Sequence, residues 1–97
     1  MIFPHTLAFN MPAVEEKTAA VLAALGLPER NDAKLAFDAT YTFCRDLGIE
    51  MRLSALGVPR NDLGVMADEA HAIRRLLDNN PRDLGRDAIL NMYEVAF

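Results

Sequence analysis

The stretch NDAKLAFDATYTFCRDL, residues 31–47, decides the fold class of this chain. Its apolar residues return every three or four positions, which is the spacing of one side of an α-helix. Asn31 precedes them as an N-cap, and Gly48 follows as a helix stop. We expect a helix this apolar to be covered on more than one side, with its aromatic residues in a core rather than in a ligand pocket. The expected buried stripe consists of Leu35, Ala39, Phe43 and Leu47, widened by Phe37, Tyr41 and Cys44.

The residues before this stretch indicate two more helical segments. Residues 1–10, MIFPHTLAFN, are apolar where chain termini are usually polar, so we interpret them as the tail of a helix whose beginning is missing. That interpretation makes the chain a fragment of a longer protein. A helix from about Pro12 to Leu25 follows, with acidic residues in its first turn and Gly26 as its stop. The side chains expected to be buried in the first segment are Ile2, Phe3, Leu7 and Phe9.

The residues after this stretch complete the helical pattern. Residues 49–58 suggest an extended entry and one helical turn, and residues 78–83 form a loop. Helices are expected from about Asp62 to Leu77 and from Arg86 to Ala96. The sequence therefore predicts an all-α fold, a single domain over residues 1–97 built as a small bundle of four main helices plus a short N-terminal helical segment. The buried face expected of the helix from Asp62 consists of Leu63, Met66, Ala67, Ala70, Ile73 and Leu77.

The composition excludes several classes of function. The formal net charge is −4 and no segment is a run of Lys and Arg, so nucleic-acid binding is not expected. No apolar run is long enough to span a membrane, and no cationic leader precedes an apolar segment. Cys44 is the only cysteine, which rules out an internal disulfide and favours a reducing compartment. We therefore expect a cytoplasmic protein in which Cys44 is a core residue rather than a reactive thiol.

Residues that could bind a metal are few. Asp68 and His71 lie three positions apart on one side of a helix, which suits two ligands of one metal ion, but the spacing identifies no third ligand. The simpler interpretation is that His71 caps the end of the helix or bonds a neighbouring carboxylate. His5 is expected to be a hydrogen-bonded packing residue. The residues alone therefore predict no metal site and no catalytic group.

The loop Asn80-Pro81-Arg82 carries a different candidate. Pro81 keeps Asn80 extended, and Asp78 and Asp83 lie close to Arg82 in sequence. An arginine held by carboxylates and carbonyls on such a loop would fasten the last two helices together. A structural role is therefore the simpler interpretation, and direct contact with a ligand is the alternative.

Three stretches in order resemble the iron-dependent alcohol dehydrogenase family. FPHTLAFN at 3–10 is similar to the family's "LPHvlrfN". LGI at 47–49 with LSALGV at 53–58 is similar to "LGIP..L.elGv", and NPR at 80–82 with DAILNMYEVAF at 87–97 is similar to "NPR…dil.iy..A". Each motif is short, but their order and spacing agree and the likeness extends over essentially the whole chain. Maleylacetate reductases share much of this pattern and form a candidate subgroup.

The resemblance implies an all-helical C-terminal domain of the dehydroquinate synthase-like type, preceded by a dinucleotide-binding domain. In the family, iron or sometimes zinc lies between the two domains, and hydride passes between an alcohol carbon and NAD(P). One Asp and three His hold the metal, and His5 matches a histidine that follows the last of these ligands. All four ligands would lie upstream, so this chain alone is expected to bind neither metal nor nucleotide and to be inactive. Leu76, four positions before Asn80, matches a family position that lines the substrate pocket, and it also suits a core.

Two interpretations of function follow from these observations. In the first, the chain is the substrate- and metal-side domain of a dehydrogenase. It then works with its missing N-terminal dinucleotide-binding part or with a separately encoded equivalent. In the alternative, it is a freestanding helical module for protein interaction, which would form a homo-oligomer through Ile2, Phe3 and Phe9 without catalysis.

Overall fold

The computed structural model describes residues 1–29 and 32–97, and all regular structure within these residues is helical. The α-helices are α1 (Phe3–Asn10), α2 (Glu15–Ala24), α3 (Ala33–Asp46), α4 (Leu63–His71), α5 (Arg74–Leu77) and α6 (Arg86–Ala96). Three short 3-10 helices lie between them, η1 (Met11–Ala13), η2 (Ser54–Leu56) and η3 (Arg60–Asp62). The predicted all-α fold is confirmed, with one of the four expected main helices divided into α4 and α5.

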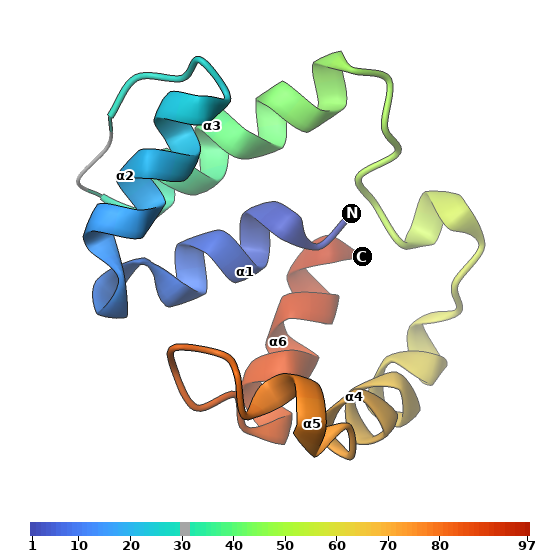
Figure 1. Ribbon diagram of the computed structural model, residues 1–97. Helices are drawn as coiled ribbons and strands as arrows, with labels where there is room; N and C mark the ends of the chain where they lie inside the picture. Colours follow the sequence, from blue (N-terminus) through green and yellow to red (C-terminus); the bar gives the residue numbers. More distant parts are fainter. Residues whose placement is uncertain (30–31) are drawn as a thin grey trace.

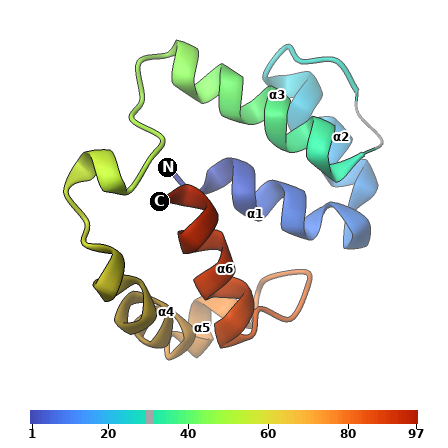
Figure 2. The same ribbon diagram turned by 180° about the vertical axis from the view of Figure 1, so that it is seen from behind.

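The helices form two groups that meet at α1. Helices α1, α2 and α3 make one group, α4, α5 and α6 make the other, and the two ends of the chain lie close together (Figure 1). Helix α1 packs along α3 and also contacts α6, while α4 packs along α6. The view from behind also places α1 between α3 and α6 (Figure 2). α1 is therefore the element that joins the two groups.

Each group has its own small apolar core. In the first, Met11, Leu22 and Ala36 are buried, and the partly buried Leu7, Leu27 and Ala33 pack against them. In the second, Leu53, Leu63 and Ala96 are buried, and the residues packed against them are Ile2, Val58, Met66, Leu90, Tyr93 and Phe97. Two thin cores cover fewer helix faces than one large core would, and large apolar side chains stay exposed on several helices.

Local signals set the ends of the helices as the sequence predicts. Gly26, Gly48 and Gly57 have φ angles of 73°, 83° and 84° and follow the ends of α2, α3 and η2. Glycine adopts this left-handed conformation without the steric cost that a Cβ atom brings, so it terminates a helix cleanly.

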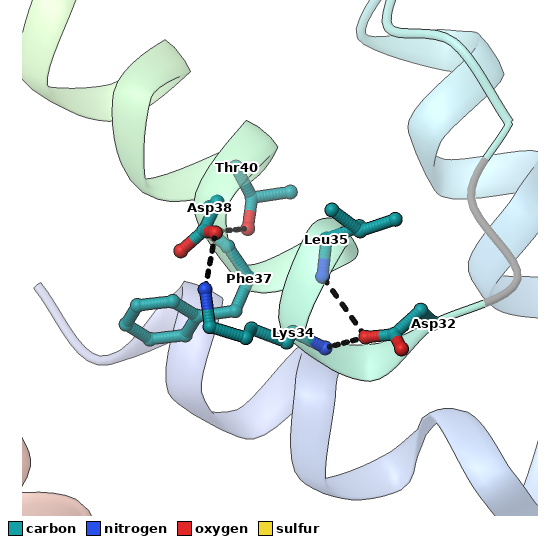
Figure 3. A network of polar contacts seen from close by, with 6 residues as sticks. All are labelled: Asp32, Lys34, Leu35, Phe37, Asp38 and Thr40. Carbon is teal, nitrogen blue, oxygen red and sulfur yellow. Dashed lines mark hydrogen bonds and ion pairs between the residues drawn. The ribbon is translucent and has the colours of Figure 1, made fainter.

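The start of α3 is capped by a side chain. The carboxylate of Asp32 accepts hydrogen bonds from the backbone N–H groups of Lys34 and Leu35, at 2.7 and 3.3 Å (Figure 3). This satisfies two donors that a helix otherwise leaves unpaired in its first turn. The cap expected from the sequence, Asn31, lies outside the described residues.

The buried face of α3 differs from the predicted one. The fully covered positions are Ala36, Thr40 and Cys44, whereas Leu35 and Leu47 are 49% and 65% exposed. Small side chains let α1 approach this face of α3 closely, and the buried Thr40 hydroxyl is satisfied because it donates to the Ala36 carbonyl at 2.8 Å. Cys44 is buried as predicted, but the predicted stripe from Leu35 to Leu47 was wrong. α3 is apolar on two sides, and the leucine side is the one left uncovered.

Two other faces also depart from the sequence prediction. In α1 the buried residues are Pro4 and His5, while Phe3 is 36% exposed, because eight residues are too few for periodicity to fix which side meets α3. The helix expected to continue to Leu77 breaks at Ile73, whose φ and ψ are −84° and 69°. Past this break the chain runs in a new direction, and Ile73 is 46% exposed instead of buried.

The end of α6 is held by the segment around η2. The Leu53 N–H donates to the Ala96 carbonyl at 2.8 Å, and the backbone N–H and hydroxyl of Ser54 both donate to the Phe97 carbonyl. The Arg60 guanidinium lies 4.3 Å from the centre of the Phe97 ring. Carbonyls that a helix end leaves without partners are thus satisfied by a segment more than forty residues earlier in the chain.

Candidate functional site

An open cleft of about 270 Å³ lies where α1, α3 and α6 meet. Its walls are largely apolar and aromatic, with one histidine and one asparagine as polar groups. The lining residues are His5, Phe9, Phe37, Ala88, Asn91, Met92 and Val95. Concave apolar surfaces with a few polar groups are where proteins bind small molecules, which makes this cleft the first place to look for a site.

His5 is the most unusual residue of this cleft. Its side chain is 6% exposed, and neither ring nitrogen has a hydrogen-bond partner among the described residues. The ring packs edge-on against Phe37, with centroids 4.8 Å apart and planes at 80°, and Phe37 stacks in turn on Tyr41. Burial lowers the pKa of His5 below its ordinary value, which favours the neutral form of the ring. His5 is therefore a packing residue, as predicted, but its ring does not make the predicted hydrogen bonds within the described residues.

The loop Asn80-Pro81-Arg82 is attached to the C-terminal end of α1. The Arg82 guanidinium donates to the Phe9 carbonyl at 2.6 Å and lies 4.0 Å from the centre of the Phe9 ring. Asn80 exchanges two amide hydrogen bonds with Asn10 and also donates to the Arg82 carbonyl at 2.7 Å. The sequence suggested that Arg82 fastens the last two helices together. The structure places its contacts on α1 instead, and so on the wall of the cleft, which Phe9 also lines.

Asp68 and His71 make contacts with different residues and not with each other. The Asp68 carboxylate accepts from the Arg86 guanidinium at 2.7 Å, a contact that joins α4 to α6 and raises the pKa of Arg86. His71 Nε2 lies 3.2 Å from the guanidinium of Arg74 at the start of α5, so the contact expected with a carboxylate is made with an arginine instead. Within residues 1–29 and 32–97, no three His, Cys, Asp or Glu side chains are grouped closely enough to hold a metal ion.

Leu76 lies on α5 with 59% of its surface exposed. This exposure excludes the alternative that it is a core leucine of this chain, and it leaves the side chain available to a neighbouring part of a protein or to a ligand. Leu76 is not among the residues that line the cleft at His5. The family resemblance therefore indicates a pocket at Leu76, whereas the structure has its apolar cleft at His5.

Sequence reasoning missed the cleft because its residues come from distant segments. His5, Phe37 and Asn91 lie on three helices, and each reads in the sequence as an ordinary member of a helical face. The role of Asn10 was also missed, although it ends the FPHTLAFN stretch that resembles the family motif. One signal in the sequence could have indicated the contact between Asn10 and Asn80. The FPHTLAFN stretch and the Asn-Pro-Arg stretch both belong to the family pattern.

These observations define an all-helical domain with an apolar cleft, and comparison with known proteins places it in a family. The model described as "Fe-containing alcohol dehydrogenase family, C-terminal" matches residues 1–97, so the chain belongs to this family. It is 39% identical to the sulfoacetaldehyde reductase of Bilophila wadsworthia, over 97% of this chain and 26% of that protein. It is 33% identical to the maleylacetate reductase of Pseudomonas knackmussii and 31% identical to that of Burkholderia cepacia, over 100% of this chain and 25% of each relative.

The chain thus spans about a quarter of the length of these curated relatives. No solved structure gives a significant match. In the part of the chain that the structure describes, no helix is both long and apolar enough to cross a membrane.

Proposed function

We propose that this chain is the C-terminal helical part of a metal-dependent, NAD(P)-linked alcohol dehydrogenase-like oxidoreductase, and that it does not turn over substrate alone. One observation carries the proposal: the family match covers residues 1–97, and the same residues span only a quarter of the related reductases. The other three quarters, as part of the same protein or as a separately encoded partner, would supply the dinucleotide-binding domain.

The reaction we propose is reduction of a small carbonyl compound or the reverse oxidation of an alcohol. Relatives that match nearly the whole chain are named for the reduction of sulfoacetaldehyde and of maleylacetate. Both names give a small carbonyl-containing compound as the one that is reduced. The complete site, and not this chain alone, would determine which carbonyl compound is reduced.

Iron, named in the family description, or zinc would polarise the substrate oxygen when bound in the complete enzyme. The described residues bring no three potential ligands together, so the ligands would come from the remainder of the enzyme. The role left to this chain is to shape the site. Leu76 would form part of the substrate wall, and the loop Asn80-Pro81-Arg82 would fix the position of this wall relative to α1.

A chimera tests the proposal. This chain would replace the C-terminal quarter of the sulfoacetaldehyde reductase, and the truncated reductase without any replacement is the control. We expect the chimera to bind iron and to reduce sulfoacetaldehyde with NADH or NADPH. The 97-residue chain alone, supplied with iron or zinc, should show no turnover. Turnover by the chain alone contradicts the proposal, and so does a folded, iron-bound chimera that is as inactive as the control.

We further propose a cytoplasmic location, since Cys44 is free and buried, as is common in proteins of reducing compartments.

A second candidate function, a helical interaction module, is favoured by one specific observation. The leucine side of α3 is left uncovered, with Leu35 and Leu47 largely exposed.

A further inference from the structure

His5 combines deep burial with polar nitrogens that have no hydrogen-bond partner. Its side chain is 6% exposed, and neither Nδ1 nor Nε2 meets a hydrogen-bonding atom among the described residues. A neutral imidazole carries one N–H donor and one acceptor nitrogen. Burying such groups unpaired costs free energy, and the large majority of buried polar side-chain atoms in folded proteins have a partner. We therefore expect His5 to have a partner that the described residues do not supply.

The cleft beside His5 has the form of a groove between two helix faces. His5 and Phe9 lie one turn apart on α1, and four further lining residues come from one side of α6 at helical spacing. The ring of Phe37, on α3, packs against His5 from a third direction. Val95 lines the cleft and is still 61% exposed. Two apolar helix faces that diverge in this way leave room for one more segment to pack between them.

The lining of the cleft defines the chemistry of its occupant. When His5 is neutral, none of the side chains that line the cleft carries a charge. A charged occupant would lose its hydration there without gaining an opposite charge. The occupant should therefore be mostly apolar, with one polar group that forms a hydrogen bond with His5. A packed protein segment has both features.

The position of the cleft favours one particular segment. The start of α1 lies beside the end of α6, so the N-terminus is next to the cleft (Figures 1 and 2). The family match is to a C-terminal region, and the chain spans about a quarter of its curated relatives. If the chain is the C-terminal part of such an enzyme, the remainder joins it at Met1, about one helical turn from His5.

We propose that the cleft at His5 receives a segment of the part of the enzyme that precedes residue 1, and that this segment forms a hydrogen bond with the His5 ring. The inference rests on the proposed function and adds to it a contact surface and a contact residue. A half-turn of the ring about the Cβ–Cγ bond exchanges its nitrogens with carbons and keeps the space that it fills. The part of the ring that lines the cleft can therefore present a nitrogen to the segment.

Thiol labelling tests whether the cleft is covered. Val95→Cys is made in the isolated chain and in the chimera with the sulfoacetaldehyde reductase, and its reaction with a maleimide is followed at that residue by mass spectrometry. The reaction should be roughly tenfold slower or more in the chimera, because a covered thiol reacts only when the site opens. Ala20→Cys, at an exposed position of α2 outside the cleft, is the control and should react equally in both.

Three results of this labelling would overturn the proposal. Equal rates for Val95→Cys in the two proteins would show that the cleft stays open in the enzyme, as a small-molecule site would. Slow reaction in the isolated chain would show that a second copy already covers it. Equal slowing at Ala20→Cys would show that the protection is not specific to the cleft.

The substitution His5→Leu tests the hydrogen bond. At pH 7.5 it should not lower the melting temperature of the isolated chain, where the ring has no partner to lose. In the chimera it should lower the melting temperature by about 2 °C or more, because the polar group of the segment is left buried and unpaired. His71→Gln is the control and should change neither protein. A chimera that His5→Leu leaves as stable as before contradicts the hydrogen bond.

The intact sulfoacetaldehyde reductase gives a second measurement that does not depend on the folding of the chimera. A cysteine at its residue aligned with Val95 should be protected from the maleimide, and full reactivity there overturns the proposal. Neither test uses catalysis as its readout. A folded, protected chimera without turnover would therefore contradict the proposed function alone, and an active chimera with an open cleft would contradict this inference alone.

Discussion

Asn10 and Asn80 join their side-chain amides across 70 residues of sequence. Asn10 Nδ2 donates to Asn80 Oδ1 at 2.8 Å, and Asn80 Nδ2 donates back to Asn10 Oδ1 at 2.9 Å. The pair attaches the loop before α6 to the end of α1, the helix that connects the two groups. Because each amide is both donor and acceptor to the other, loss of one side chain leaves the remaining amide without its partner.

We therefore expect Asn10 and Asn80 to be strongly coupled in stability. Asn10→Ala and Asn80→Ala should each lower the free energy of unfolding by about 1–2 kcal/mol. The double variant should lose little more than either single variant, giving a coupling energy of about 1 kcal/mol. Urea unfolding of the four proteins measures this cycle. Strictly additive losses would show that the two amides act independently.

Arg82 is expected to stabilise the fold through its contacts with Phe9 rather than through its contribution to the net charge. Arg82→Ala removes a hydrogen bond to the Phe9 carbonyl and a guanidinium stacked on the Phe9 ring, so it should cost about 1 kcal/mol. Arg82→Lys should recover only part of this loss, because an ammonium group lacks the planar face that stacks on the ring. Thermal unfolding measures both effects. Arg75→Ala, which removes an exposed arginine of α5, is the matched control. An equal loss of stability in Arg75→Ala would show that the effect of Arg82→Ala comes from net charge and not from the contacts with Phe9.

His5 should make the stability depend on pH in a defined window. Its folded pKa is lowered below the ordinary value of 6.5, so the unfolded chain takes up a proton first as the pH falls. The contribution of the neutral ring is thus complete above about pH 6.5 and declines below it, by at most about 1.4 kcal/mol per pH unit, until the folded pKa is reached. His5→Leu should remove this decline. At pH 7.5 it should be neutral or stabilising, because no hydrogen bond of the ring is lost.

Urea unfolding at several values between pH 5 and pH 7.5 measures the effect of His5. His71→Gln serves as the control, since it removes the other histidine of the chain and leaves His5 in place. If the pH dependence of His5→Leu equals that of the unchanged chain while His71→Gln flattens it, the assignment to His5 is wrong.

The positions of the helices could be predicted from the sequence because their ends are local. Gly26, Gly48 and Gly57 act through their own backbone conformation, and the last helix begins and ends as expected at Arg86 and Ala96. The break at Ile73 was not predictable in the same way. No Gly or Pro marks it, and its apolar side chain continues the helical spacing.

The orientation of α3 could not be predicted because it depends on the rest of the fold. Leu35 and Leu47 are the larger apolar residues, yet α1 packs on the side of Ala36 and Thr40, where close approach is easier. The same limit applies to the site. A structural role for Arg82 was expected from its rigid loop, but its target, Phe9, lies 73 residues earlier and no local pattern connects the two.

Leu76 gives the sharpest test of a functional position, because the chain offers a matched control. Leu76 and Leu56 are both 59% exposed, on α5 and η2, so replacing either should change the stability by less than about 0.5 kcal/mol. In the chimera with the sulfoacetaldehyde reductase, Leu76→Trp should raise KM for the aldehyde several-fold, since a larger side chain would narrow the substrate wall, whereas Leu56→Trp should leave KM unchanged. Steady-state kinetics on both variants, with melting temperatures in parallel, separates the effects. Equal KM values for the two variants and the unchanged chimera would remove Leu76 from the substrate pocket.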